Sequence, residues 1–312
     1  MNRLLLCLLL AACGQGLDPQ LSENSSSLTA PRVVLGEHPH VLPLRSGAQA
    51  AAAPAGAHLD YYGGHVIPNV RVIAVYWGSL VSSSTTSRIP GFYRSVTQSP
   101  YFDWLSEYDT TITARGGQAG TNQHIGRGSF GGAFTITPSL PAPVVTNSQI
   151  QTELAAQIAG GHLPQPDQNS LYMIYFAPGT QIVLEGGVNT AASCVQFCAF
   201  HNTFTLNGQS VYYGVMPDLT DGACLLGCGP ISTDTFNNLT SVSSHELIEA
   251  VTDAEVGLAT DYAPPLAWYD QTNGEIGDIC NGTQGTVTGS DGATYTVQTE
   301  WSNVAGACIT QR

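Results

Sequence analysis

The stretch Ser243-Ser244-His245-Glu246-Leu247-Ile248-Glu249 decides the predicted fold. On a helix, His245 and Glu249 lie four residues apart and face the same side, which is the spacing of two ligands of a metal ion. Glu246 then lies beside that ion as a candidate general base. The apolar residues of the same segment fall on the other side, which predicts a ligand face and a core face. The alternative is a solvated, acidic helix surface.

Strands and helices alternate along the rest of the chain. Besides the ligand helix, expected over 239–252, the pattern predicts a strand at 70–77, a helix at 92–108, a helix from Asn147 to Gly160, a strand at 171–176 and a hairpin of strands 199–206 and 211–216 around Asn207-Gly208. Asp291-Gly292 marks a second hairpin, and the glycine-rich run 126–132 is expected to form a turn. The predicted fold class is α/β (α+β), with a mixed sheet.

The first residues carry targeting information. Residues 1–12 have a positive start and an apolar run too short to cross a bilayer, which predicts a signal peptide. Leu10-Ala11-Ala12-Cys13 resembles a bacterial lipobox, so Cys13 is the expected lipidated residue, anchoring the chain to a membrane of the cell envelope, at the outer membrane or cell surface. Ordinary secretion is the alternative. Residues 13–57, rich in Ser, Ala, Pro and Gly, are expected to be a flexible tether or a pro-segment, which leaves 58–312 as one domain.

The charge of the chain excludes several functions. Removal of residues 1–12 leaves 8 arginines against 23 acidic residues, a formal charge of about −15, so nucleic acid is not an expected partner. The chain contains no lysine, which excludes a Walker-type phosphate site and Schiff-base chemistry.

Six cysteines follow Cys13, and in an exported protein an even number indicates three disulfides. They are Cys194, Cys198, Cys224, Cys228, Cys280 and Cys308. Cys280 and Cys308 bracket an apparent hairpin, and their disulfide would stabilise the fold by roughly 3 kcal/mol. The pairing of the other four stays open, and a four-thiolate zinc site is the weaker alternative because three residues separate each pair.

Several short motifs occur in series between residues 61 and 308. They are Tyr62-Gly63-Gly64, Cys194-x3-Cys198-Ala199-Phe200-His201, His245-Glu246-Leu247-x-Glu249-Ala250, Trp268-Tyr269 and Glu275-Ile276-x-Asp278-x-Cys280. In this order they resemble the EXORDIUM, or phosphate-induced protein 1, family of plant cell walls, which has bacterial relatives. The resemblance implies a secreted protein but no settled biochemical activity.

The layout also resembles the upper half of zincin metalloproteases, in which the helix after an edge strand supplies H-E-x-x-H. Here Glu249 takes the place of the second histidine, which lowers the Lewis acidity of a bound zinc and shifts selectivity toward calcium or manganese. The third ligand is expected from Glu275 or Asp278, by analogy with zincins that use a downstream Glu, with His201 as an outside candidate. Asp253 is a candidate to orient the imidazole of His245.

These observations predict an exported, surface-anchored metal-dependent hydrolase of the peptidase type, acting on a peptide or cell-envelope substrate. The alternative is a non-catalytic recognition or signalling module whose metal ion only stabilises the fold. The rival fold is an unrelated α+β sandwich held by disulfides. Trp268, Tyr269 and Asp270 could line a cleft, although buried aromatic residues more often belong to a core. The sequons at Asn24, Asn238 and Asn281 are interpreted as chance.

Overall fold

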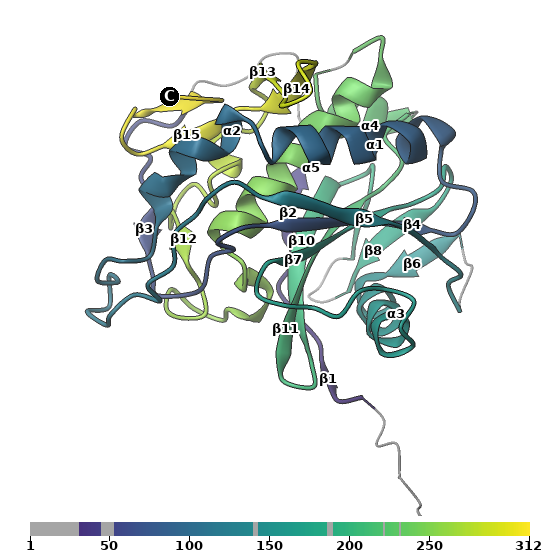
Figure 1. The fold of residues 1–312 in the computed structure, drawn as a ribbon, viewed down its shortest axis with the longest axis horizontal. Coiled ribbons are helices and arrows are strands. Elements are labelled where there is room, and N and C mark those ends of the chain that lie inside the picture. Colours follow the sequence, from purple (N-terminus) through teal and green to yellow (C-terminus); the bar gives the residue numbers. More distant parts are fainter. Residues whose placement is uncertain (1–30, 45–52, 140–142, 186–189, 221, 231) are drawn as a thin grey trace, which may run out of the picture. The chain divides into compact units, whose positions relative to one another are not determined.

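A mixed β-sheet forms the centre of the structure (Figure 1), a computed structural model that describes residues 31–44, 53–139, 143–185, 190–220, 222–230 and 232–312. The predicted signal peptide and Cys13 lie outside the described residues. Residues 31–312 form one unit. Within the described part of the chain, we find no helix with the length and apolar character needed to cross a membrane.

The strand order of the sheet is β1-β10-β11-β7-β4-β5, and β2 also pairs with β10. The strands are β1 (Val33–Val34), β2 (His40–Pro43), β4 (Arg71–Trp77), β5 (Ser129–Ile136), β7 (Ser170–Tyr175), β10 (Phe197–Leu206) and β11 (Gln209–Met216). Strands β11, β7, β4 and β5 are parallel to one another. Strand β10 is antiparallel to β11, and β1 and β2 are antiparallel to β10. The N-terminal strands therefore cover the outer edge of β10.

Helices cover both faces of the sheet, as Figure 1 shows. Helices α1 (Ser83–Val96) and α5 (Thr235–Thr252) share one apolar core with the sheet, and α3 (Asn147–Ala159) packs in a second core on the other face. The strand residues alternate between the two cores, as the pleat requires. A capping box begins α3, because Thr146 and Gln149 satisfy each other's backbone N–H groups.

Shorter elements surround this framework. They are α2 (Pro100–Asp103), α4 (Gly222–Gly227), the 3₁₀ helices η1 (Trp104–Tyr108), η2 (Val256–Leu258) and η3 (Asp278–Cys280), and the strands β3 (Asp60–Tyr61), β6 (Val144–Thr146), β8 (Gln181–Leu184), β9 (Ala191–Ala192), β12 (Trp268–Tyr269), β13 (Gln284–Thr288), β14 (Thr294–Gln298), β15 (Glu300–Ser302) and β16 (Ala307–Ile309). Strand β14 packs against α5, so the C-terminal hairpins lie beside this helix.

Three disulfides hold the fold together: Cys194–Cys224, Cys198–Cys228 and Cys280–Cys308. The predicted disulfide framework is confirmed, and the four-thiolate zinc site is excluded because all four of its sulfurs are paired with one another. The first two bonds join the turn before β10 and the start of β10 to α4 and the residue that follows it, and the third joins η3 to β16.

The structure corrects three sequence predictions. Residues 31–44, assigned to the tether, instead include β1 and β2, because the free edge of β10 offers them backbone hydrogen bonds. The helix expected over 92–108 begins at Ser83 and breaks after Val96 into α2 and η1. Residues 129–132 of the predicted turn lie in β5, where Gly132 has φ +121° beside an irregularity in the pairing with β4.

Candidate metal centre

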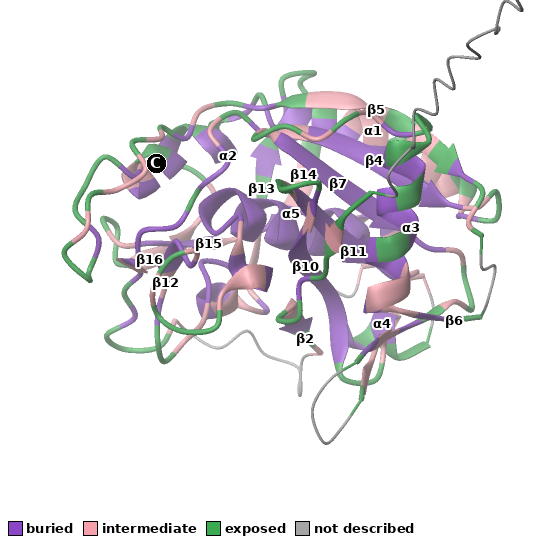
Figure 2. Cartoon of the chain, turned by 90° about the horizontal axis from the view of Figure 1, so that it is seen from below, coloured by how far each residue is buried: buried purple, intermediate pink, exposed green. Residues whose placement is uncertain are grey.

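Helix α5 carries its acidic face inside the protein. The side chains of His245, Glu246 and Glu249 are at most 1% exposed. Figure 2 shows α5 as a buried element between the sheet and the C-terminal strands. The alternative of a solvated acidic surface is therefore wrong. Asp234 caps the helix by accepting from the N–H of Phe236, which fixes where the ligand-bearing turns begin.

Seven ionisable side chains meet at this face of α5, and we call them the buried cluster. They are His40, His201, His245, Glu246, Glu249, Glu275 and Asp278. They come from four segments: β2, β10, α5, and η3 with the turn that leads into it. The chain has no lysine, and the ion pairs of the described arginines all involve carboxylates outside this cluster. Only protons or a bound cation can balance its four carboxylates.

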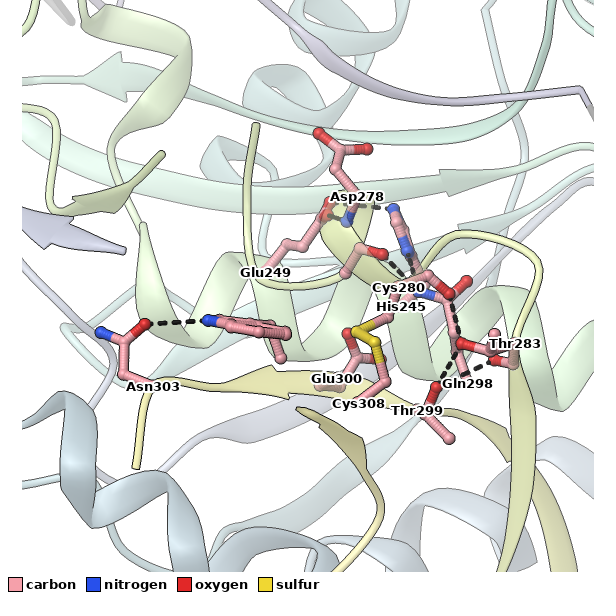
Figure 3. Close-up of a disulfide and its surroundings, with 12 residues drawn as sticks. His245, Glu249, Asp278, Cys280, Thr283, Gln298, Thr299, Glu300, Asn303 and Cys308 are labelled. Atoms are coloured by element: carbon pink, nitrogen blue, oxygen red, sulfur yellow. Dashed lines mark hydrogen bonds and ion pairs between the residues drawn. A yellow bond between two sulfur atoms is a disulfide. The ribbon is translucent and has the colours of Figure 1, made fainter. Parts of the chain in front are cut away.

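His245 and Glu249 are held in a defined geometry (Figure 3). His245 Nε2 lies 3.0 Å from Glu249 Oε2, and the other carboxylate oxygen of Glu249 accepts from the backbone N–H of Asp278 at 3.1 Å. On the far side of the ring, Gln298 Nε2 lies 2.7 Å from His245 Nδ1 and also donates to the carbonyl of Gly277 at 2.8 Å. Gln298 thus connects β14 to both the imidazole and the turn before η3.

His201 lies on β10, with its ring directed at the carboxylates of α5. Its Nδ1 is 3.2 Å from Glu246 Oε2 and 3.5 Å from Glu249 Oε2, and its Nε2 is 3.4 Å from Glu275 Oε1. Glu246 is placed to accept from Nδ1, and in the neutral ring the Nε2 lone pair would face Glu275. Burial alone would lower the pKa of His201, but Glu275 and the carboxylates of α5 raise it well above its usual value. A lone pair that faces a carboxylate in a dry interior needs a proton or a cation between them.

His40 completes the cluster from β2. The ladder places it opposite His201, and its Nδ1 lies 2.9 Å from Glu275 Oε2. Its ring packs edge-on against Tyr269, with centroids 5.4 Å apart. His40 is half-buried, as are Tyr269 and Asp278, so the cluster comes closest to solvent at these three residues.

Burial and mutual repulsion shift the protonation of the cluster. Burial raises the pKa of Glu246 to about 7, and burial together with the charge of Glu249 raises the pKa of Asp278 to about 8. Burial alone would lower the pKa of His245, but Glu249 raises it to about 10. A raised pKa favours a second proton on the imidazole ring. The amide N–H of Gln298 opposes this proton, because the N–H group needs Nδ1 as its acceptor. In the absence of a cation, the cluster is thus neutralised by protons.

Several buried atoms of the cluster have no hydrogen-bond partner among the described residues. They are Nε2 of His201 and of His245, Oε1 of Glu246, and both carboxylate oxygens of Glu275. Buried polar atoms are normally paired, so these atoms mark a place where a ligand is expected. Three overlapping groups have ligand atoms within 4.8 Å of one another: His245, Glu249 and Asp278; His40, Glu275 and Asp278; His201, Glu246 and Glu249. Imidazole and carboxylate donors at these separations suit zinc or manganese.

The structure brings together the residues that the sequence nominated as ligands, His245, Glu249, Glu275 and Asp278, and His201 joins them. Asp253 does not orient His245. Its Oδ1 accepts from the N–H of Ala267, and the imidazole is oriented by Gln298.

The aromatic segment suggested as a cleft wall is mainly structural. Trp268 is in the main core, and Asp270 accepts from the backbone N–H groups of Thr272 and Asn273 to stabilise the turn that follows it. Only Tyr269 contacts the buried cluster, through His40.

Sequence reasoning missed three residues of the site. His40 lay in the presumed tether and was therefore not considered. The only signal for Gln298 was that it is a polar residue on the core-facing side of a hairpin strand. The backbone of Gly277 adopts a negative φ that any residue could adopt. A Cβ at this position, however, would lie 2.5 Å from His245 Nδ1 and 2.8 Å from Glu249 Oε1. It is the absence of a side chain at this position that lets the turn approach α5.

Comparison of the chain with protein-family models, with curated proteins and with solved structures finds no match. The functional argument therefore rests on the geometry of the buried cluster.

Proposed function

We propose that the protein is an exported, surface-anchored metal-dependent hydrolase of the peptidase type, with a divalent cation held by His245, Glu249 and Asp278. The observation that carries this proposal is the set of buried ligand atoms around α5 that have no hydrogen-bond partner among the described residues. The three disulfides agree with folding in an oxidising compartment outside the cytoplasm. Lipid attachment at Cys13, the zincin-like arrangement and the resemblance to the EXORDIUM family remain part of the proposal.

The donor set fits a cation. Two ligands of a tetrahedral zinc ion lie about 3.3 Å apart, and His245 Nε2 and Glu249 Oε2 are 3.0 Å apart. A histidine that binds through Nε2 carries its proton on Nδ1, so ion binding requires Gln298 to present its amide oxygen there. When bound, the cation would supply Lewis acidity toward a carbonyl group or a water molecule.

Glu246 is the proposed general base. It follows His245 directly on α5, its Oε2 accepts from His201, and its Oε1 is free to take a proton. His201 thereby fixes the orientation of the carboxylate. Proton transfer by a positioned carboxylate typically contributes a factor of about 10²–10⁴ to the rate.

Glu246→Gln tests this role, because it preserves size and one acceptor oxygen while removing the base. We expect hydrolysis of an unfolded, fluorescently labelled protein to fall at least about a hundredfold, with metal content and melting temperature nearly unchanged. Glu255→Gln is the matched control, since Glu255 pairs with His65 and Ser210 away from the cluster. An active wild type with an equally active Glu246→Gln variant would contradict the catalytic role.

A second function is favoured by one observation, the near-complete burial of the cluster. Glu246 and Glu275 are both 0% exposed, as expected of a cation that only stabilises a recognition or signalling module. In that case metal binding should raise the melting temperature, while neither the wild type nor any variant hydrolyses the labelled protein.

A further inference from the structure

Glu275 occupies an unusual environment for a carboxylate. It is 0% exposed, and its two oxygens lie 2.9 Å from His40 Nδ1 and 3.4 Å from His201 Nε2. Neither oxygen accepts a well-aligned hydrogen bond from any described residue. Buried carboxylate oxygens normally have hydrogen-bond partners, so either protons or a shared cation must lie between Glu275 and the two imidazoles that face it.

The ligands around Glu275 are largely separate from those of the cation proposed above. His40, Glu275 and Asp278 form one group, and His245, Glu249 and Asp278 form another, so that these two groups share Asp278; a third group joins His201 to Glu246 and Glu249. His201 Nε2, which has no hydrogen-bond partner among the described residues, lies 3.4 Å from Glu275 Oε1 and offers a further donor beside the first group. Glu246 accepts the hydrogen bond from the other ring nitrogen of His201, which is the arrangement that holds a metal-binding imidazole in the correct tautomer.

The charge of the cluster points the same way. Its four carboxylates carry four negative charges when ionised, and no lysine is present in the chain to offset them. One divalent cation balances two of these charges and leaves the other two to protons on the histidines or carboxyl groups. Two divalent cations balance the four carboxylates and leave the three histidines neutral, which is the form in which imidazole binds metals.

We infer that the cluster binds two divalent cations, the second held by His40, His201 and Glu275, with Asp278 as a carboxylate shared between the two ions. The first ion is the cation of the proposed function, held by His245, Glu249 and Asp278. The inference rests on the proposed function only for this first ion. Carboxylate-bridged pairs of ions occur about 3.5–4 Å apart in hydrolytic enzymes, where they position two oxygens of the substrate. The mixed imidazole and carboxylate donors suit zinc or manganese at both positions.

Metal stoichiometry of the full-length protein tests this inference. Protein stripped with a chelator is titrated with zinc chloride and separately with manganese chloride, and bound metal is measured by calorimetry and elemental analysis. We expect two equivalents per chain for the wild type and for Glu255→Gln, and one equivalent for Glu275→Gln. Because Glu275→Gln could disturb folding, His40→Ala at the half-buried end of the cluster is measured in parallel and should also retain one equivalent.

The manganese-loaded wild type adds a readout that does not depend on counting. Two bridged Mn²⁺ ions should give an exchange-coupled electron paramagnetic resonance spectrum, and Glu275→Gln should give the six-line spectrum of an isolated ion. One equivalent in the wild type, or two equivalents with an uncoupled spectrum, would overturn the shared site. One equivalent leaves the first cation of the proposed function in place, whereas no bound metal removes both cations, so the two failures are distinguishable.

Discussion

Replacing Gly277 by alanine is the sharpest test of the geometry, because one methyl group would enter the contact between the η3 turn and α5. The new Cβ would lie 2.5 Å from His245 Nδ1 and 2.8 Å from Glu249 Oε1. To reach an ordinary contact, the imidazole must move by at least about half an ångström. Metal sites tolerate deviations of about 0.2 Å in ligand distance. We therefore expect metal affinity to fall about 10- to 100-fold, the scale seen when the support of a ligand is removed.

The stability of the metal-free variant follows from two opposing effects. Crowding in a packed interior costs about 1–3 kcal/mol, and the reduced freedom of the unfolded chain returns about 0.4–1 kcal/mol. The net loss is about 1–2 kcal/mol, which lowers the melting temperature by several degrees in a unit of this size. Gly91→Ala is the control, because Gly91 lies inside α1 and its new Cβ would meet only Tyr295 Oη, at 3.9 Å. That variant should gain about 0.5–1 kcal/mol.

Calorimetric titration with zinc and thermal unfolding in a chelator measure the two effects separately. If Gly277→Ala bound zinc as tightly as the wild type and melted at the same temperature, the close approach of the turn to α5 would not be what positions His245. If only the stability fell, the crowding argument would hold and the proposed ligand role of His245 would be wrong.

Two further predictions concern the C-terminal disulfide and pH. Replacing both Cys280 and Cys308 by serine should lower the free energy of unfolding by roughly 3 kcal/mol, measured by denaturant titration, because the disulfide closes a loop across 28 positions; an unchanged midpoint would refute this. In the metal-free protein, the raised pKa values of Glu246, about 7, and Asp278, about 8, mean that the folded state holds protons that the unfolded state has already released above about pH 4.5. Stability should therefore fall as the pH rises from about 5 to 8, and saturating zinc should remove this fall; a metal-free melting temperature that rose over this range would contradict the assignment of the buried carboxyls.

The elements that the sequence predicted well are those specified by local signals. The hairpin around Asn207-Gly208 needs two positive φ values, which these residues provide at +53° and +84°. The helix at Asn147 begins with its capping box, and α5 carries the spacing of ligand and core faces. Each of these signals is contained within a few neighbouring residues, so no knowledge of the tertiary structure was needed.

The errors arose where distant segments decide the structure. Strands β1 and β2 are too short to show a period, and they form because the edge of β10 is available. His40 was missed for the same reason, since its partner Glu275 lies more than two hundred residues away. Gln298 reaches His245 only because β14 packs against α5. Long-range pairing of this kind leaves no mark in a single sequence window.

The order of the cluster's segments along the chain has a consequence for how the protein is made. His40 lies near the beginning of the folded unit, whereas Gln298, which contacts His245, lies in β14, after every residue of the buried cluster along the chain. A chain in which β14 has not yet packed against α5 lacks part of the centre, and an unfolded chain offers no preformed site. Under the proposed function, a cation bound here would therefore be selected from those available where folding is completed.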